Sequence, residues 1–282
     1  MRKRHDYTFG DNDLASQRLR RLAQIYEPEA RELLSRHGTR SARLAVDLGC
    51  GPGWSTALVR EVLRPRRTVG LDASERFVTE ARRHHGPAIE FTVHDISEVP
   101  FPVGAPDLLV CRFLLTHLRN LDVVLTAWAR AAAPGARLLV HETERLEAEH
   151  LSLRRYYELL GELQAQHGQA LDVGTKLEAY FARTPWRLVY SESRRLEKPA
   201  SAMAELHLAN LRTWREQEFA RKNFDSLELD RLEMALDRIA RGVEEGGKVI
   251  NFARQMAAEL PALEGPSYSG TGQSQPATSA RM

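Results

Sequence analysis

Apolar residues along this chain alternate between short continuous runs and stripes with helical spacing. The runs, each rich in Val, Leu or Ile, cover residues 43–48, 68–72, 89–93, 107–111 and 136–141. The helical stripes between them cover residues 55–63, 74–85 and 122–133. Strands that are apolar throughout and that alternate with helices indicate a parallel sheet covered on both faces. The sequence therefore predicts an α/β protein with a doubly wound, mostly parallel sheet.

The pattern changes on either side of this core, which spans residues 41–143. Residues 1–40 carry two helical stripes separated at Pro28, which predicts an N-terminal helical cap. Beyond the core, a long charged stripe predicts one helix from Glu144 to Gln166. The expected divisions there are a helical insertion at 144–183, a core strand at 184–200, a helical lid at 201–246, a last strand at 247–260 and a tail at 261–282. The tail is rich in Gly, Ser, Pro, Thr and Gln, a composition that favours disorder.

Composition places the chain among globular proteins and narrows its partners. It has 282 residues, 43% hydrophobic and 28% charged, with a formal net charge of +2. This near balance gives no general support for binding nucleic acid. Two cysteines exclude a disulfide framework and fit a reducing compartment. The basic start Met1–His5 lacks a following apolar segment, and no run is long enough to span a bilayer, so we expect a cytoplasmic protein without a membrane partner.

Three predicted strands end in residues suited to a nucleoside-sized ligand. The first is followed by the glycine-rich segment Asp47–Gly53, with glycines at 49, 51 and 53 that allow a sharp turn and close approach of a ligand. The spacing is not that of a dinucleotide or phosphate loop. Asp72 ends the second strand, where a carboxylate can accept both hydroxyls of a ribose, and Asp95 follows the third. In parallel sheets these carboxyl ends meet at one crevice.

These residues resemble the motifs of class I S-adenosylmethionine-dependent methyltransferases. Val46–Gly53 resembles the first motif, Gly70–Ser74 the second and Asp95-Ile96 the acidic motif on the adenine side. Pro106–Val110 and Pro134–Val140 resemble the segments of the fourth and fifth strands. The match covers residues 42–143, about a third of the chain, and it implies a seven-stranded Rossmann-like sheet with S-adenosylmethionine as cofactor.

The resemblance also implies a set of cofactor-binding residues. Gly49, Cys50, Gly51 and Gly53 would surround the cofactor, and Asp72 with Ala73 would bind its ribose. The others would be Asp95 and Ile96 at the adenine, and Asp47 and Arg112 near the methionine end. The segment 111–115, Cys-Arg-Phe-Leu-Leu, departs from the Asn/Asp-Pro-Pro-Tyr motif of base-modifying relatives, which argues against a nucleic-acid acceptor. The flanking helices resemble the caps of bacterial small-molecule methyltransferases.

His117 and Glu142 are the candidate catalytic residues. Methyl transfer is an in-line displacement that depends mainly on positioning, and a base is needed only if the nucleophile arrives protonated. His117 follows the fourth strand by six residues, and Glu142 lies just past the fifth, where it could orient a substrate hydroxyl. The ordinary alternative for His117 is packing or capping at a helix start. No cysteine lies near a histidine in a catalytic pattern, and His84-His85 lacks a further ligand at metal spacing, so we expect no metal site.

The sequence thus predicts transfer of a methyl group from S-adenosylmethionine to a small organic acceptor, in secondary metabolism. Two alternatives stay open: a non-methylating step such as cyclisation with the cofactor bound, and methylation of protein or RNA. The acceptor, its reacting atom (O, N or C) and assembly into a homo-oligomer are left open as well.

Overall fold

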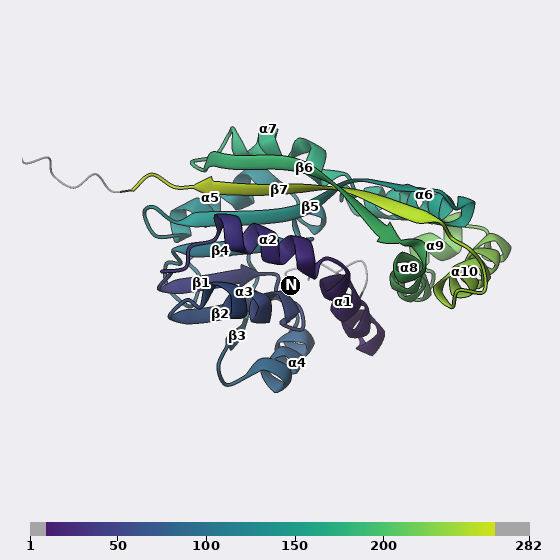
Figure 1. Ribbon diagram of the computed structural model, residues 1–282, viewed down its shortest axis with the longest axis horizontal. Coiled ribbons are helices and arrows are strands. Elements are labelled where there is room, and N and C mark those ends of the chain that lie inside the picture. The colour runs from purple at the N-terminus through teal and green to yellow at the C-terminus, as the bar shows by residue number, and fades with distance from the viewer. Residues whose placement is uncertain (1–9, 263–282) are drawn as a thin grey trace, which may run out of the picture.

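The computed structural model describes residues 10–262, which form one seven-stranded sheet with flanking helices and a helical lid at one end (Figure 1). The strands are β1 (Leu44–Leu48), β2 (Arg67–Asp72), β3 (Glu90–Val93), β4 (Leu108–Arg112), β5 (Arg137–Ala148), β6 (Arg187–Pro199) and β7 (Lys248–Glu259). Their order in the sheet is β3-β2-β1-β4-β5-β7-β6. Only β7 among them runs antiparallel to its neighbours, β5 and β6. The predicted doubly wound, mostly parallel fold is confirmed.

Helices cover both faces of the sheet and extend beyond it. The α-helices are α1 (Asp13–Ile25), α2 (Glu27–His37), α3 (Trp54–Leu63), α4 (Glu75–His85), α5 (Leu121–Ala131), α6 (Leu151–Gln166), α7 (Leu177–Phe181), α8 (Ala200–Trp214), α9 (Glu218–Asn223) and α10 (Ser226–Ala240). Two 3₁₀ turns are η1 (Leu115–His117) and η2 (Val173–Lys176). Pro28 lies in the first turn of α2, where its missing N–H costs no helical hydrogen bond.

The central strands are apolar on both faces because each face is buried under helices. In β1, Val46 and Leu48 pack into the core that contains α5 and α7, whereas Ala45 packs into the core that contains α2 and α3. All five residues of β1 are buried. This arrangement explains the continuous apolar runs and leaves the carboxyl ends of the strands as the place where polar side chains can gather.

Strand β5 is longer than the sequence predicts, and the expected helix from Glu144 is wrong at its start. The strand continues to Ala148, and α6 begins only at Leu151. The carboxylate of Glu144 accepts a hydrogen bond from Arg254 Nε of β7 at 2.8 Å and another from Ser193 of β6. Because partners from two neighbouring strands neutralise and satisfy this buried carboxylate, a residue that looked like a helix surface lies inside the sheet.

Helices α6, α8, α9 and α10 form the lid, which has a hydrophobic core of its own beyond the end of β5. Figure 1 shows α1 between this lid and the half of the sheet that holds β1 to β3, on the side where the parallel strands end. Leu22 and Ile25 of α1 pack against the lid core. The lid and α1 therefore lie around the edge of the sheet where the candidate residues gather.

Two predictions concern segments at the ends of the chain. The basic start Met1–His5 and nearly all of the predicted disordered tail, from residue 263 onward, lie outside the described residues. Within residues 10–262, no helix is both long and apolar enough to cross a membrane.

Candidate functional site

The turn between β1 and α3 depends on its three glycines. Gly49, Gly51 and Gly53 have φ angles of +66°, +52° and +90°, a region that side chains disfavour. A Cβ atom at Gly53 would also lie 2.9 Å from the ring of Phe91. The turn is tied to β2 by the N–H of Cys50, which donates to the carbonyl of Leu71 at 3.0 Å. The sequence thus folds here into a tight backbone loop that a side chain at any of the three positions would disturb.

Asp72 links the end of β2 to this turn. Its carboxylate accepts hydrogen bonds from the N–H groups of Gly51 and Ser74, both at 2.8 Å. Burial raises the pKa of Asp72, and the two backbone donors oppose that rise. The neighbouring Ala73 is exposed. Asp72 and the backbone of the glycine turn therefore form one hydrogen-bonded unit.

Asp47 lies at the base of the turn, 2% exposed. Thr56 of α3 donates to it from Oγ1 at 2.7 Å. Burial raises the pKa of Asp47 to about 7, while the bond from Thr56 and the positive charge of Arg112 act in the opposite direction. Arg112, at the end of β4, is the cation that faces this carboxylate.

Asp95 and Ile96 follow the end of β3, and one side chain is exposed whereas the other is buried. Asp95 is exposed, and its Oδ1 accepts bonds from the N–H of Ser97 at 2.9 Å and from the Ser97 hydroxyl at 2.6 Å. Ile96 is buried, and its carbonyl accepts a bond from Trp128 Nε1 at 2.7 Å. An apolar side chain and a carboxylate therefore stand side by side at this strand end.

Cys50 and Cys111 are both buried and free. Burial raises the pKa of each thiol well above its ordinary value, and nearby carboxylates raise it further. Both side chains therefore stay neutral thiols that fill space, Cys50 within the turn and Cys111 in the core beneath the sheet.

Helix α1 lies over the glycine turn. A Cβ atom at Gly51 would come within 3.3 Å of Leu19 Cδ1. Side-chain bonds fasten this part of the chain to α4 and its start: Ser16 donates to Glu80, and Ser74 Oγ donates to Asp11 at 2.9 Å. A ligand that occupies the turn would therefore contact α1 directly.

The candidate catalytic residues are linked through the turn η1. Glu142 is 1% exposed, and its Oε1 accepts the N–H groups of Leu114 and Leu115, both at 2.7 Å. It thereby holds the start of η1, the turn that carries His117. Burial raises the pKa of Glu142 to about 8. Burial, followed by the charge of Arg18, lowers the pKa of His117 to about 3. Their catalytic roles stay predictions.

Three residues that the sequence analysis did not single out as site residues adjoin Arg112: Tyr26, Phe113 and His141. His141 is 0% exposed, and neither of its ring nitrogens has a hydrogen-bond partner among residues 10–262. Its ring lies 4.9 Å from that of Phe113 and 6.1 Å from that of Tyr26. The Tyr26 hydroxyl accepts a bond from Asn251 Nδ2 at 2.7 Å, across 225 residues of sequence. The sequence offered one local indication of these residues: successive side chains of a strand point to opposite faces, so His141 faces away from Glu142 in β5.

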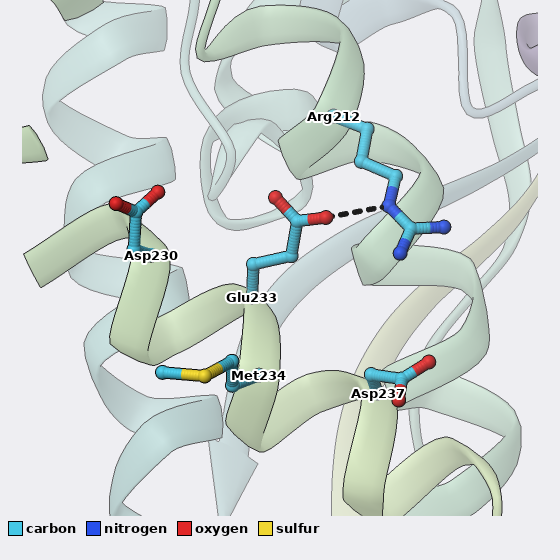
Figure 2. A pocket seen from close by; sticks show the side chains of 5 residues that line it. All are labelled: Arg212, Asp230, Glu233, Met234 and Asp237. Atoms are coloured by element: carbon cyan, nitrogen blue, oxygen red, sulfur yellow. Dashed lines mark hydrogen bonds and ion pairs between the residues drawn. The ribbon is translucent and has the colours of Figure 1, made fainter. Parts of the chain in front are cut away.

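Figure 2 shows a polar pocket in the lid, between α8 and α10, apart from the glycine turn. It is lined by Arg212, Asp230, Glu233, Met234 and Asp237. Its acidic groups have cationic partners, such as Arg212 Nε, which lies 2.8 Å from Glu233 Oε1. No group of three or more His, Cys, Asp or Glu side chains in residues 10–262 could hold a metal ion. The lid pocket is therefore an ion-paired surface separate from the glycine turn.

Comparisons with known proteins agree with this geometry. Residues 46–140 match a family model described as a methyltransferase domain. The resemblance to class I S-adenosylmethionine-dependent methyltransferases is thereby confirmed for this part of the chain. A trans-aconitate 2-methyltransferase of Paracidovorax citrulli (strain AAC00-1) is 36% identical over 127 residues, 44% of this chain and 48% of that protein. One from Acidovorax sp. (strain JS42) is 32% identical over 167 residues, 57% and 64% of the two chains. The chain thus spans about half the length of the first of these relatives.

Solved structures share the fold at low sequence identity. A Haemonchus contortus phosphoethanolamine N-methyltransferase, in complex with phosphomonomethylethanolamine and S-adenosylhomocysteine, has a TM-score of 0.56 and 16% identity over 92% of this chain and 60% of that chain. The [4+2]-cyclase SpnF has a TM-score of 0.55 and 16% identity over 85% and 83% of the two chains. Because one fold serves a methyltransferase and a cyclase, the fold alone does not select the reaction.

Proposed function

We propose that this chain transfers a methyl group from S-adenosylmethionine to a small organic acceptor. The observation that carries the proposal is the unit formed by Asp72 and the glycine turn. The carboxylate bonds the Gly51 N–H, so an acid and an open backbone loop meet at the carboxyl ends of β1 and β2. This is where a doubly wound sheet binds nucleosides.

The residues at this edge fit the cofactor. Each Asp72 oxygen accepts one backbone bond and retains a lone pair for a ribose hydroxyl. Asp95 with Ile96 would hold the adenine, and Asp47 with Arg112 the methionine end. Gly49, Gly51 and Gly53 leave the backbone open, while Cys50 and Ala73 complete the lining. When bound, S-adenosylmethionine supplies a methyl group on a sulfonium, which needs only a well-placed nucleophile.

For the acceptor we propose a carboxylic acid that is methylated on a carboxylate oxygen. At neutral pH, a pKa of about 3 makes the His117 imidazole a weak proton acceptor. A pKa of about 8 keeps Glu142 largely protonated, and its Oε1 already holds two backbone N–H groups. A carboxylate arrives deprotonated and needs no base, so these two residues would contact and orient the acceptor instead. The names of the two trans-aconitate 2-methyltransferase relatives point to the same acceptor class.

The lid supports a small acceptor rather than a polymer. Helix α1 lies over the glycine turn, and it packs against a lid that has its own buried core. Such a cover would enclose an acid of a few carbons but would exclude a folded protein or an RNA. Cytoplasmic location, a role in secondary metabolism and homo-oligomer formation stay predictions.

The function is tested by measuring S-adenosylhomocysteine after the full chain is incubated with S-adenosylmethionine and a panel of small acceptors. The panel pairs trans-aconitate and other carboxylic acids with amines and alcohols of similar size. We expect S-adenosylhomocysteine and a methyl ester with at least one acid. Cofactor binding without S-adenosylhomocysteine across the panel would favour the cyclase alternative instead.

A further inference from the structure

The lid contains a group of buried polar side chains that no step above uses. We call it the lid cluster: Tyr156 and Tyr157 of α6, and His207, Asn210 and Trp214 of α8. The three α8 residues recur at spacings of three and four, so they share one face of that helix. All five side chains are buried, with exposures between 0% and 8%. A polar face of this kind is expensive to bury inside a helical lid.

The members of the lid cluster contact one another. The rings of Tyr156 and His207 stack with centroids 4.4 Å apart, and those of Tyr156 and Trp214 lie 6.3 Å apart. The Tyr157 hydroxyl forms a hydrogen bond with His207 Nε2 at 2.9 Å. Two helices therefore bring aromatic faces and polar edges to one place.

Four polar atoms of the lid cluster have no hydrogen-bond partner in the described structure: Tyr156 Oη, His207 Nδ1, Asn210 Oδ1 and Trp214 Nε1. Burial raises the pKa of Tyr156 to about 12, and the side chains of Asn210 and Trp214, which face its hydroxyl, oppose that rise. A buried polar atom that is left without a partner destabilises the folded chain. Buried polar groups are nearly always bonded, so four together indicate a site for an incoming polar ligand.

Arg18 of α1 connects the lid cluster to the catalytic edge of the sheet. This residue is 6% exposed. After burial, its positive charge is the next cause that lowers the pKa of His207 to about 3 and that of His117 to about 3. Arg18 lies on α1, which packs against α8 of the lid and lies over the glycine turn through Leu19, so its charge acts on both the lid cluster and η1, the turn that follows β4.

We propose that the lid cluster and Arg18 bind a second, non-reacting carboxylate of the acceptor. The guanidinium of Arg18, the Tyr156 hydroxyl and the Trp214 N–H are hydrogen-bond donors that suit an anion. His207 Nδ1 and Asn210 Oδ1 can satisfy a hydroxyl or a water beside it. The inference rests on the proposed function and extends it: the substrate is a di- or tricarboxylic acid, one carboxylate of which is methylated while another is held under the lid.

The test measures binding of two acids to the full chain saturated with S-adenosylhomocysteine. Trans-aconitate carries additional carboxylates, whereas crotonate is an unsaturated acid with a single one. Tyr156→Phe removes only the hydroxyl. Trp214→Phe removes the indole N–H and also makes the ring smaller. Tyr180→Phe, on α7 outside the lid, is the matched control.

Calorimetry should show trans-aconitate binding weakened about tenfold by Tyr156→Phe and by Trp214→Phe. Crotonate binding should be unchanged by both, and Tyr180→Phe should change neither acid. This selective loss would support the inference even if the wild-type chain produced no S-adenosylhomocysteine, in which case only the proposed function would fail. Equal effects on both acids, or no binding of trans-aconitate by the wild-type chain, would overturn the inference. If a chain with either of these results still methylated an acceptor with a single polar group, the proposed function would stand and only the further inference would fail.

Discussion

Replacing Asp72 by alanine should weaken the binding of both S-adenosylmethionine and S-adenosylhomocysteine. In the structure the carboxylate already accepts two backbone N–H groups at 2.8 Å, and a ribose would use its remaining lone pairs. Losing charge-assisted hydrogen bonds to the ribose costs about 2 kcal/mol or more. That corresponds to a rise of roughly 30-fold in Kd. The Gly51 N–H would lose its partner as well, so the turn itself should become less well fixed.

Isothermal calorimetry with S-adenosylhomocysteine measures this change directly. Asp72→Asn is the informative companion, because it keeps the shape and one acceptor oxygen but removes the charge. We expect its Kd to lie between those of the wild-type chain and Asp72→Ala. Thermal unfolding of each variant, recorded first, ensures that binding is measured on folded protein. An unchanged Kd in a folded Asp72→Ala variant would remove Asp72 from the ribose site and refute the reasoning.

Further predictions concern the turn, the lid and the candidate catalytic residues. Gly51→Val should abolish calorimetric binding of S-adenosylhomocysteine, because a side chain there is strained at φ +52° and would contact Leu19 of α1. Hydrogen exchange in α1, α6, α8 and α10 should slow when S-adenosylhomocysteine binds, and equal exchange with and without it would assign these helices to a remote surface. His117→Ala should lower kcat about 10²-fold or more if the residue acts on a protonated acceptor, and much less for a carboxylate, with cofactor Kd unchanged in either case. The pKa of Glu142 is raised in the folded chain, so its contribution to stability falls as pH rises from its unfolded pKa towards about 8. Melting curves at several pH values should therefore show Glu142→Gln gaining stability relative to wild type as pH increases, and a constant difference would contradict this.

The parts of the fold that sequence could predict depend on local chemistry. The glycine turn follows from three residues whose φ angles exclude side chains, and the position of Asp72 follows from the strand that precedes it. The central strands were recognisable because both of their faces are buried. These features need no knowledge of distant partners.

Other features depend on contacts between distant parts of the chain. The extension of β5 past Thr143 rests on Glu144, whose partner Arg254 is 110 residues away. Helix α1 could be predicted as a cap, but its contact with Gly51 through Leu19 could not. The sequence prediction put Glu142 just past the fifth strand, but the residue lies inside the longer β5, and its bonds to Leu114 and Leu115 became visible only in the folded chain. No periodicity or spacing carries such pairings, because they are made by tertiary packing.

The most direct test of the central claim follows a labelled methyl group. The full chain is incubated with S-adenosylmethionine that carries a deuterated methyl group, in the presence of trans-aconitate, and the small-molecule fraction is analysed by mass spectrometry. The account predicts the label in a methyl ester of the acid, formed in equal amount with S-adenosylhomocysteine, and strongly reduced in the Asp72→Ala variant when the cofactor concentration lies below its Kd for that variant. Label that stays on intact S-adenosylmethionine with every small acid tested, or that appears in a protein or RNA fraction instead, would contradict it.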